Sequence, residues 1–112
     1  MHAFASHRLE LFVDDMVAYV RRRHPTLATP SDDERLRLVV RARIERAQAL
    51  GIRLRAHFKR YLNLTFTLGA DFCREPWAAT TLANTDLVMA ARLHKLERDA
   101  VFRARAVARS VE

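Results

Sequence analysis

Glycine, proline and cysteine are all scarce in this sequence. Its 112 residues include only two glycines, three prolines and one cysteine. Because glycine and proline mark turns and helix ends, their scarcity predicts few turns and long helices, and we expect an all-α fold. Two glycines cannot build a glycine-rich phosphate-binding loop. The single cysteine, Cys73, excludes an internal disulfide and fits a reducing compartment.

Long apolar runs are also missing. No stretch approaches the roughly 20 apolar residues that a membrane-spanning helix needs. The start of the chain already carries Glu10, Asp14 and Asp15, which is unlike a secretory signal peptide. We therefore expect a cytoplasmic protein with no membrane partner. The length suits a single helical domain, residues 1–112, that buries a modest core without a metal or a disulfide.

Apolar residues that recur every three or four positions predict five helices joined by short links. The expected ranges are from about 4 or 6 to 23, 31–50, 54–68, 77–82 and from 86 to beyond 108. The predicted architecture is a compact bundle of four to five helices with a long C-terminal helix. The third helix is apolar on most sides and should be the central one. Residues 64–68 also alternate like a strand, but no second strand-like run can pair with them.

Each predicted helix should turn one apolar stripe toward the core. The stripe of the second helix is Leu36, Val39, Val40, Ile44 and Ala47, and that of the third is Leu54, Phe58, Tyr61, Leu62, Thr65 and Phe66.

Several residues mark helix ends. Ser31 and Glu34 have the spacing of a capping box at the start of the second helix. Gly51 and Gly69 supply the left-handed residue that commonly ends a helix. Pro76 fits the first position of the short fourth helix.

Positive charge comes almost entirely from arginine, since only Lys59 and Lys95 among the twenty basic residues are lysine. The net charge of +7 raises the alternative of a small basic nucleic-acid-binding regulator. Thirteen acidic residues are interleaved with the basic ones, whereas a nucleic-acid footprint usually concentrates charge on one face. A helix-turn-helix centred on Gly51 is disfavoured, because its recognition helix is very apolar and has few donors near its start beyond Arg53 and Arg55.

No arrangement typical of catalysis is visible. The five histidines show no metal-binding spacing, so we expect no metal, no cofactor and no enzyme activity. Cys73 lies between Asp71 and Glu75 in the chain, and negative neighbours would raise the thiol pKa and disfavour a nucleophile. The two carboxylates have no histidine or oxyanion donor beside them and are better explained as helix-capping groups.

The segment 61–82 contains one of the two glycines, the single cysteine, the single tryptophan and one of the three prolines, and these residues lie in and around a short turn. Phe72 and Trp77 can clamp this turn onto the core, or they can serve as an aromatic anchor for a partner. Arg37 and Arg41 stand four residues apart beside the apolar stripe of the second helix. We predict Phe72, Trp77, Arg37 and Arg41 as partner-binding residues.

The segments 44–52, 68–72, 75–77 and Leu82 carry a resemblance. They resemble a family of small helical bacterial proteins encoded beside type VI secretion spike and effector-adaptor genes. Gly69, Phe72, Pro76 and Trp77 match the family pattern, whereas Cys73 stands where aspartate is common and Arg53 replaces a small polar residue. The resemblance covers the middle third of the chain.

This resemblance implies a non-enzymatic accessory protein, an adaptor or co-chaperone that binds a secretion effector or its chaperone. The composition of the chain agrees with such a role, since arginine, tryptophan and tyrosine commonly anchor protein interfaces. The oligomeric state and the partner's identity stay open at this point.

Overall fold

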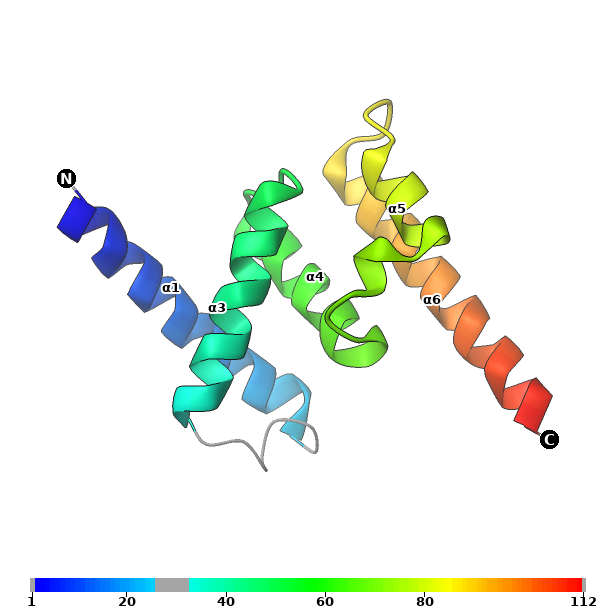
Figure 1. Cartoon of the computed structure of the whole chain (residues 1–112), viewed down its shortest axis with the longest axis horizontal. Helices are drawn as coiled ribbons and strands as arrows, with labels where there is room; N and C mark the ends of the chain where they lie inside the picture. The colour runs from blue at the N-terminus through cyan, green and yellow to red at the C-terminus, as the bar shows by residue number, and fades with distance from the viewer. Residues whose placement is uncertain (1, 26–32, 112) are drawn as a thin grey trace.

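A computed structural model describes residues 2–25 and 33–111, with side chains for 8–25 and 33–103. Over these residues the chain forms five α-helices and one 3₁₀ turn and has no strand. The elements are α1 (His2–Arg23), α3 (Asp33–Ala49), α4 (Arg55–Leu68), η1 (Phe72–Arg74), α5 (Pro76–Ala83) and α6 (Met89–Val111). The predicted all-α bundle with a long C-terminal helix is confirmed (Figure 1).

Helix α4 is the centre of the bundle, as its apolar sequence predicts. It contacts α1, α3, α6 and η1. Its buried side chains include Tyr61 and Leu62, which meet Met16 of α1, Ile44 of α3 and Leu93 of α6 in one hydrophobic cluster. Burial of such a cluster supplies most of the stabilisation that a helical bundle of this size has available.

Both glycines close helices with positive φ. Gly51 has φ +94° and Gly69 has φ +109°. After α3, the Gly51 amide donates to the Gln48 carbonyl and the Ile52 amide donates to the Ala47 carbonyl, both at 3.0 Å. This pair of hydrogen bonds is a Schellman motif, and it explains why Ile52 folds back and is fully buried.

Two residues predicted for the buried stripes are exposed. Val39 is 38% exposed, because it lies on the side of α3 next to the stripe rather than within it. Leu54 is 60% exposed, because it precedes α4 in an extended conformation as the N-cap and so lies outside the helical repeat. Ser31, predicted to open a capping box with Glu34, lies outside the described residues.

The last helix starts later than predicted. The Asp86 amide donates to the Asn84 side-chain oxygen at 3.1 Å, so Asn84 closes the turn before the helix, and α6 begins at Met89. Short polar side chains often capture a nearby amide in this way, in competition with helix formation.

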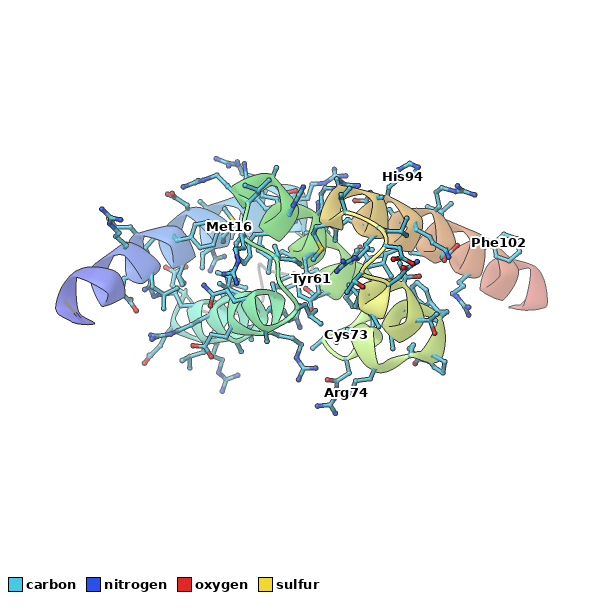
Figure 2. The ribbon with its side chains drawn as sticks, turned by 90° about the horizontal axis from the view of Figure 1, so that it is seen from above. Met16, Tyr61, Cys73, Arg74, His94 and Phe102 are labelled. Carbon is cyan, nitrogen blue, oxygen red and sulfur yellow. The ribbon has the colours of Figure 1, made fainter. Side chains whose placement is uncertain are left out.

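The molecule is flat and elongated, with extents of 50 × 38 × 19 Å and a radius of gyration of 15.0 Å. A compact chain of this length would have a radius of gyration of about 13 Å. The difference comes from α1 and α6, whose outer ends extend past the other helices on opposite sides (Figures 1 and 2). No helix among the described residues is both long enough and apolar enough to cross a membrane.

Candidate functional site

The predicted residues Arg37 and Arg41 lie between α3 and α1. The Arg37 guanidinium contacts both Glu10 and Asp14. Arg41 Nη1 lies 2.9 Å from a Glu10 carboxylate oxygen, and Arg41 Nε lies 3.5 Å from Glu45. Both side chains pair with carboxylates of α1 and so join α3 to α1, which makes their first role structural.

Phe72 and Trp77 lie at the turn after α4. Phe72 is buried, with its ring centroid 5.6 Å from that of Tyr61 and 6.4 Å from that of Trp77. It therefore clamps the turn onto α4. Trp77 is partly exposed, and the Arg103 guanidinium of α6 lies 4.6 Å from its ring centroid in a cation–π contact.

A hollow of about 540 Å³ lies beside this turn. Its lining residues are Leu68, Gly69, Ala70, Asp71, Phe72, Glu75, Trp77 and Arg103. The four predicted residues thus fall into two groups, one at the α1 and α3 interface and one at this turn.

Several other arginines also bind carboxylates within the chain. Arg55 Nη2 is 3.0 Å from an Asp15 oxygen. The Arg60 guanidinium donates to both oxygens of Glu97, at 2.6 and 3.0 Å, and so joins α4 to α6. The hydrogen bond to Glu97 raises the pKa of Arg60. Much of the arginine excess therefore holds helices together instead of forming a continuous basic face.

Arg43 and Arg46 differ from these residues, and the sequence analysis missed them. They lie three positions apart on α3 and line a hollow of about 280 Å³, which we call the α3 hollow. Its other lining residues are Val39, Ala42, Ala70 and Asp71. Arg43 Nη1 donates to the Thr65 hydroxyl at 3.2 Å, and its guanidinium lies 4.3 Å from the Phe66 ring centroid.

A sequence signal for this pair exists. Neither arginine has an acidic residue three or four positions away, whereas Arg41 has Glu45 at that spacing. Helical arginines that border the apolar stripe without such a neighbour are candidates for contacts outside their own helix.

Tyr61 and Cys73 lie near the two arginines that line the α3 hollow. Arg46 Nη1 is 3.4 Å from Cys73 Sγ, and this contact raises the pKa of Arg46. The Tyr61 hydroxyl is buried without a hydrogen-bond partner among the described residues, and its burial raises the Tyr61 pKa. The sequence argument weighed only Asp71 and Glu75 as neighbours of Cys73, while the structure adds a guanidinium that donates to the thiol.

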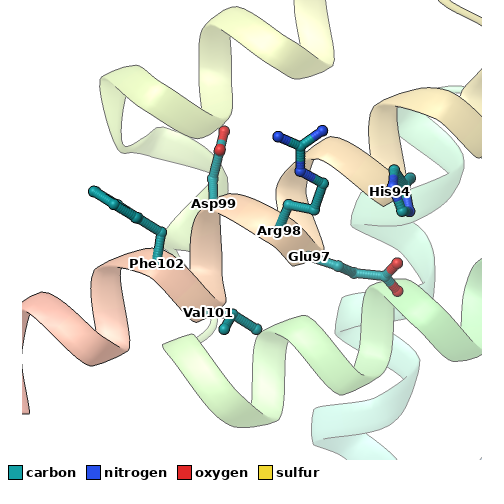
Figure 3. A pocket seen from close by; sticks show the side chains of 6 residues that line it. All are labelled: His94, Glu97, Arg98, Asp99, Val101 and Phe102. Carbon is teal, nitrogen blue, oxygen red and sulfur yellow. The ribbon is translucent and has the colours of Figure 1, made fainter.

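The outward side of α6 forms a third surface. Six α6 residues surround an open hollow of about 540 Å³, namely His94, Glu97, Arg98, Asp99, Val101 and Phe102 (Figure 3). Val101 is 53% exposed and Phe102 is 74% exposed. All six side chains come from one helix, so this is a helix face and not an enclosed cavity.

Metal-binding and catalytic groupings were also sought. Among residues with described positions, no group of three or more His, Cys, Asp and Glu side chains could hold a metal ion. The one long-range histidine hydrogen bond in this part of the chain joins His24 Nε2 to the Asn63 side-chain oxygen at 2.9 Å, and the His24 ring stacks on Phe66. This histidine links α1 to α4.

Comparison of the chain with protein-family models, curated proteins and solved structures finds no match. The resemblance to proteins encoded beside type VI secretion genes therefore stays a prediction.

Proposed function

We propose that this chain is a non-enzymatic protein-binding module and that the outward side of α6 contacts the partner. The observation that carries the proposal is the pair Val101 and Phe102, two neighbouring large apolar side chains that are mostly exposed. Single exposed apolar residues are ordinary, but phenylalanine is enriched at protein interfaces, and here it stands beside a second exposed apolar residue. Covering the Phe102 side chain alone would contribute about 1.5–3 kcal/mol.

The position of Val101 and Phe102 favours a partner that packs along the length of α6. Phe102 lies toward the end of α6 that extends away from the other helices (Figure 2), and a second helix can pack along this part of α6. His94, Lys95 and Arg98 are exposed on the same helix, while Glu97 is bound to Arg60. Asp99 lines the same face, so the apolar centre is surrounded by charges of both signs and suits a partner with an apolar stripe and a polar rim.

A more specific proposal rests on the family resemblance. In this proposal the chain is a cytoplasmic adaptor or co-chaperone for a type VI secretion effector or for the effector's chaperone. A small helical protein with an exposed anchor and few signs of catalytic chemistry suits effector loading or neutralisation. The alternative of a basic nucleic-acid-binding regulator keeps its support from the net charge of +7.

Co-purification with matched variants tests the proposal. Tagged wild-type chain, Phe102→Ser and Val88→Ser would be purified from the organism that encodes the protein. Val88 is a good control, because it is 72% exposed, about as much as Phe102, but precedes α6 at its other end. We expect one protein in near-equal amount with wild type and Val88→Ser, and its loss with Phe102→Ser.

The identity of the partner distinguishes the adaptor role from the nucleic-acid-binding alternative. A secretion effector or its chaperone supports the adaptor role. A nuclease-sensitive complex that dissociates with salt would support the nucleic-acid alternative instead. Equal recovery of a protein partner with Phe102→Ser would contradict the use of the α6 face.

A further inference from the structure

We propose that the α3 hollow binds the carboxylate of an acidic side chain that a protein partner presents. Arg43 and Arg46 both line this hollow. Among the described residues, Arg43 donates to a hydroxyl and Arg46 to a thiol, and neither lies within ion-pair distance of a carboxylate. Each guanidinium has five N–H donors, so most of their donors have no partner of opposite charge.

The electrostatics of Arg43 favour an incoming anion. Its side chain is partly buried, and desolvation lowers its pKa. A charged group that is withdrawn from water without a counter-ion is unfavourable, and a carboxylate placed beside it offsets that cost. The Thr65 hydroxyl and the Phe66 ring already hold the guanidinium in place, so little conformational freedom is lost on binding.

The size of the hollow points to a side chain. Its volume of about 280 Å³ lies just below the range of roughly 300–1,000 Å³ that is usual for small-molecule sites. Val39, Ala42 and Ala70 supply apolar walls that suit the methylene groups of a glutamate or aspartate.

The charge of the hollow favours a carboxylate over a phosphate. Asp71 forms one wall, and its negative charge opposes a dianion more than a monoanion. A single guanidinium can bind the two planar oxygens of a carboxylate through paired hydrogen bonds, and both arginines that line the hollow offer such a group.

The choice of a protein as the source of the carboxylate rests on the proposed function, whereas recognition of the carboxylate does not. The test therefore needs no partner. Its failure would leave the co-purification result unaffected, and a failed co-purification would leave this test unaffected.

Nuclear magnetic resonance of the isotope-labelled full chain provides the experiment. The Nε–Hε signals of Arg43 and Arg46 would be followed during titration with N-acetylglutamate amide at constant ionic strength. We expect saturable shifts with a dissociation constant of about 1–10 mM, the usual range for a ligand of this size. The matched neutral probe, N-acetylglutamine amide, should cause no saturable shift. Equal shifts with both probes, or shifts that do not saturate, would overturn the proposal.

Two further probes separate the ligand classes. Inorganic phosphate should bind more weakly than the glutamate probe, and tighter phosphate binding would overturn the assignment to a carboxylate. A capped tripeptide with glutamate between two leucines should bind more tightly than the single amino-acid derivative. Equal or weaker binding of the peptide would overturn the assignment to a protein ligand.

Variants localise the effect. Arg46→Gln should weaken binding of the glutamate probe about tenfold, the usual consequence of losing a charged hydrogen bond. Asp71→Asn should strengthen it several-fold by removing the opposing charge. Arg53→Gln is the control, because Arg53 is exposed and does not line the hollow. Equal losses in Arg46→Gln and Arg53→Gln would show that binding follows net charge alone and would overturn the proposal.

Discussion

The two tyrosines of this chain should respond in opposite ways to the loss of their hydroxyl groups. Tyr61 is fully buried in α4, and its hydroxyl has no hydrogen-bond partner among the described residues. Its neighbour Cys73 offers a sulfur, which is a weak acceptor at best. The Tyr19 hydroxyl, in contrast, accepts a hydrogen bond from Asn63 Nδ2 at 2.7 Å.

The magnitudes follow from these environments. A buried polar group without a partner costs about 1–3 kcal/mol, so Tyr61→Phe should raise the free energy of unfolding by up to about 2 kcal/mol. Tyr19→Phe removes one hydrogen bond and leaves Asn63 without that partner, which should lower the free energy of unfolding by about 0.5–1.5 kcal/mol. For a chain of this length, 1 kcal/mol corresponds to a shift in Tm of about 3–6 °C.

Urea and thermal unfolding provide the assay. Circular dichroism reports the helices, and fluorescence of Trp77, the single tryptophan, reports the turn that Phe72 clamps. Coincident transitions by the two probes would establish that unfolding is two-state. A fall of more than about 1 kcal/mol for Tyr61→Phe would refute the reasoning, because it would mean that the buried hydroxyl makes a strong hydrogen bond.

Three further outcomes are expected. Glu97→Gln should lower the free energy of unfolding by at most about 1 kcal/mol, because the Arg60–Glu97 pair is partly exposed. The difference in unfolding free energy between wild type and Glu97→Gln should shrink in 1 M NaCl, where the Debye length is about 3 Å. An unchanged difference in 1 M NaCl would contradict this. Gly69→Ala should lower the free energy of unfolding by about 1–3 kcal/mol through backbone strain alone, because a Cβ would meet no atom within 4 Å, and a neutral result in urea unfolding would count against the positive φ. Burial raises the Tyr61 pKa above its unfolded value of about 10, so ionisation of Tyr61 favours the unfolded state. The stability that comes from this pKa difference is fully present below about pH 10 and is lost as the pH rises toward the folded pKa. Tyr61→Phe cannot ionise and should lose less stability above about pH 10, and identical alkaline profiles of the two proteins would argue against this.

Helix positions were predictable because local signals and packing agree. The central place of α4 follows from its apolar sequence, and the ends at Gly51 and Gly69 follow from the conformations that glycine permits. Leu54 was predicted wrongly because spacing alone does not distinguish a helical residue from the N-cap before it. The late start of α6 depends on a side-chain hydrogen bond of Asn84, which competes with the helix in a way that periodicity does not reveal.

The candidate surfaces were less predictable, because they depend on contacts between elements. Arg37 and Arg41 resemble interface residues in the sequence, yet both contact Glu10, a residue 27 or more positions away. Arg43 and Arg46 have no acidic neighbour on their own helix, but the contacts that place them, with Thr65 and Cys73, are to residues more than 20 positions away. Phe102 was outside the predicted set although it lies off the buried repeat Leu93, Leu96 and Ala100, because spacing alone does not distinguish a binding residue from an ordinary exposed one.

Site-specific photo-crosslinking in living cells tests the protein-binding role most directly. A photoreactive phenylalanine analogue would replace Phe102 in one variant and Leu54 in another, since Leu54 is similarly exposed but lies before α4. The proposed function predicts one defined protein adduct from position 102 and none from position 54. Adducts of equal yield from both positions, no adduct from position 102, or an adduct that nuclease removes would contradict it.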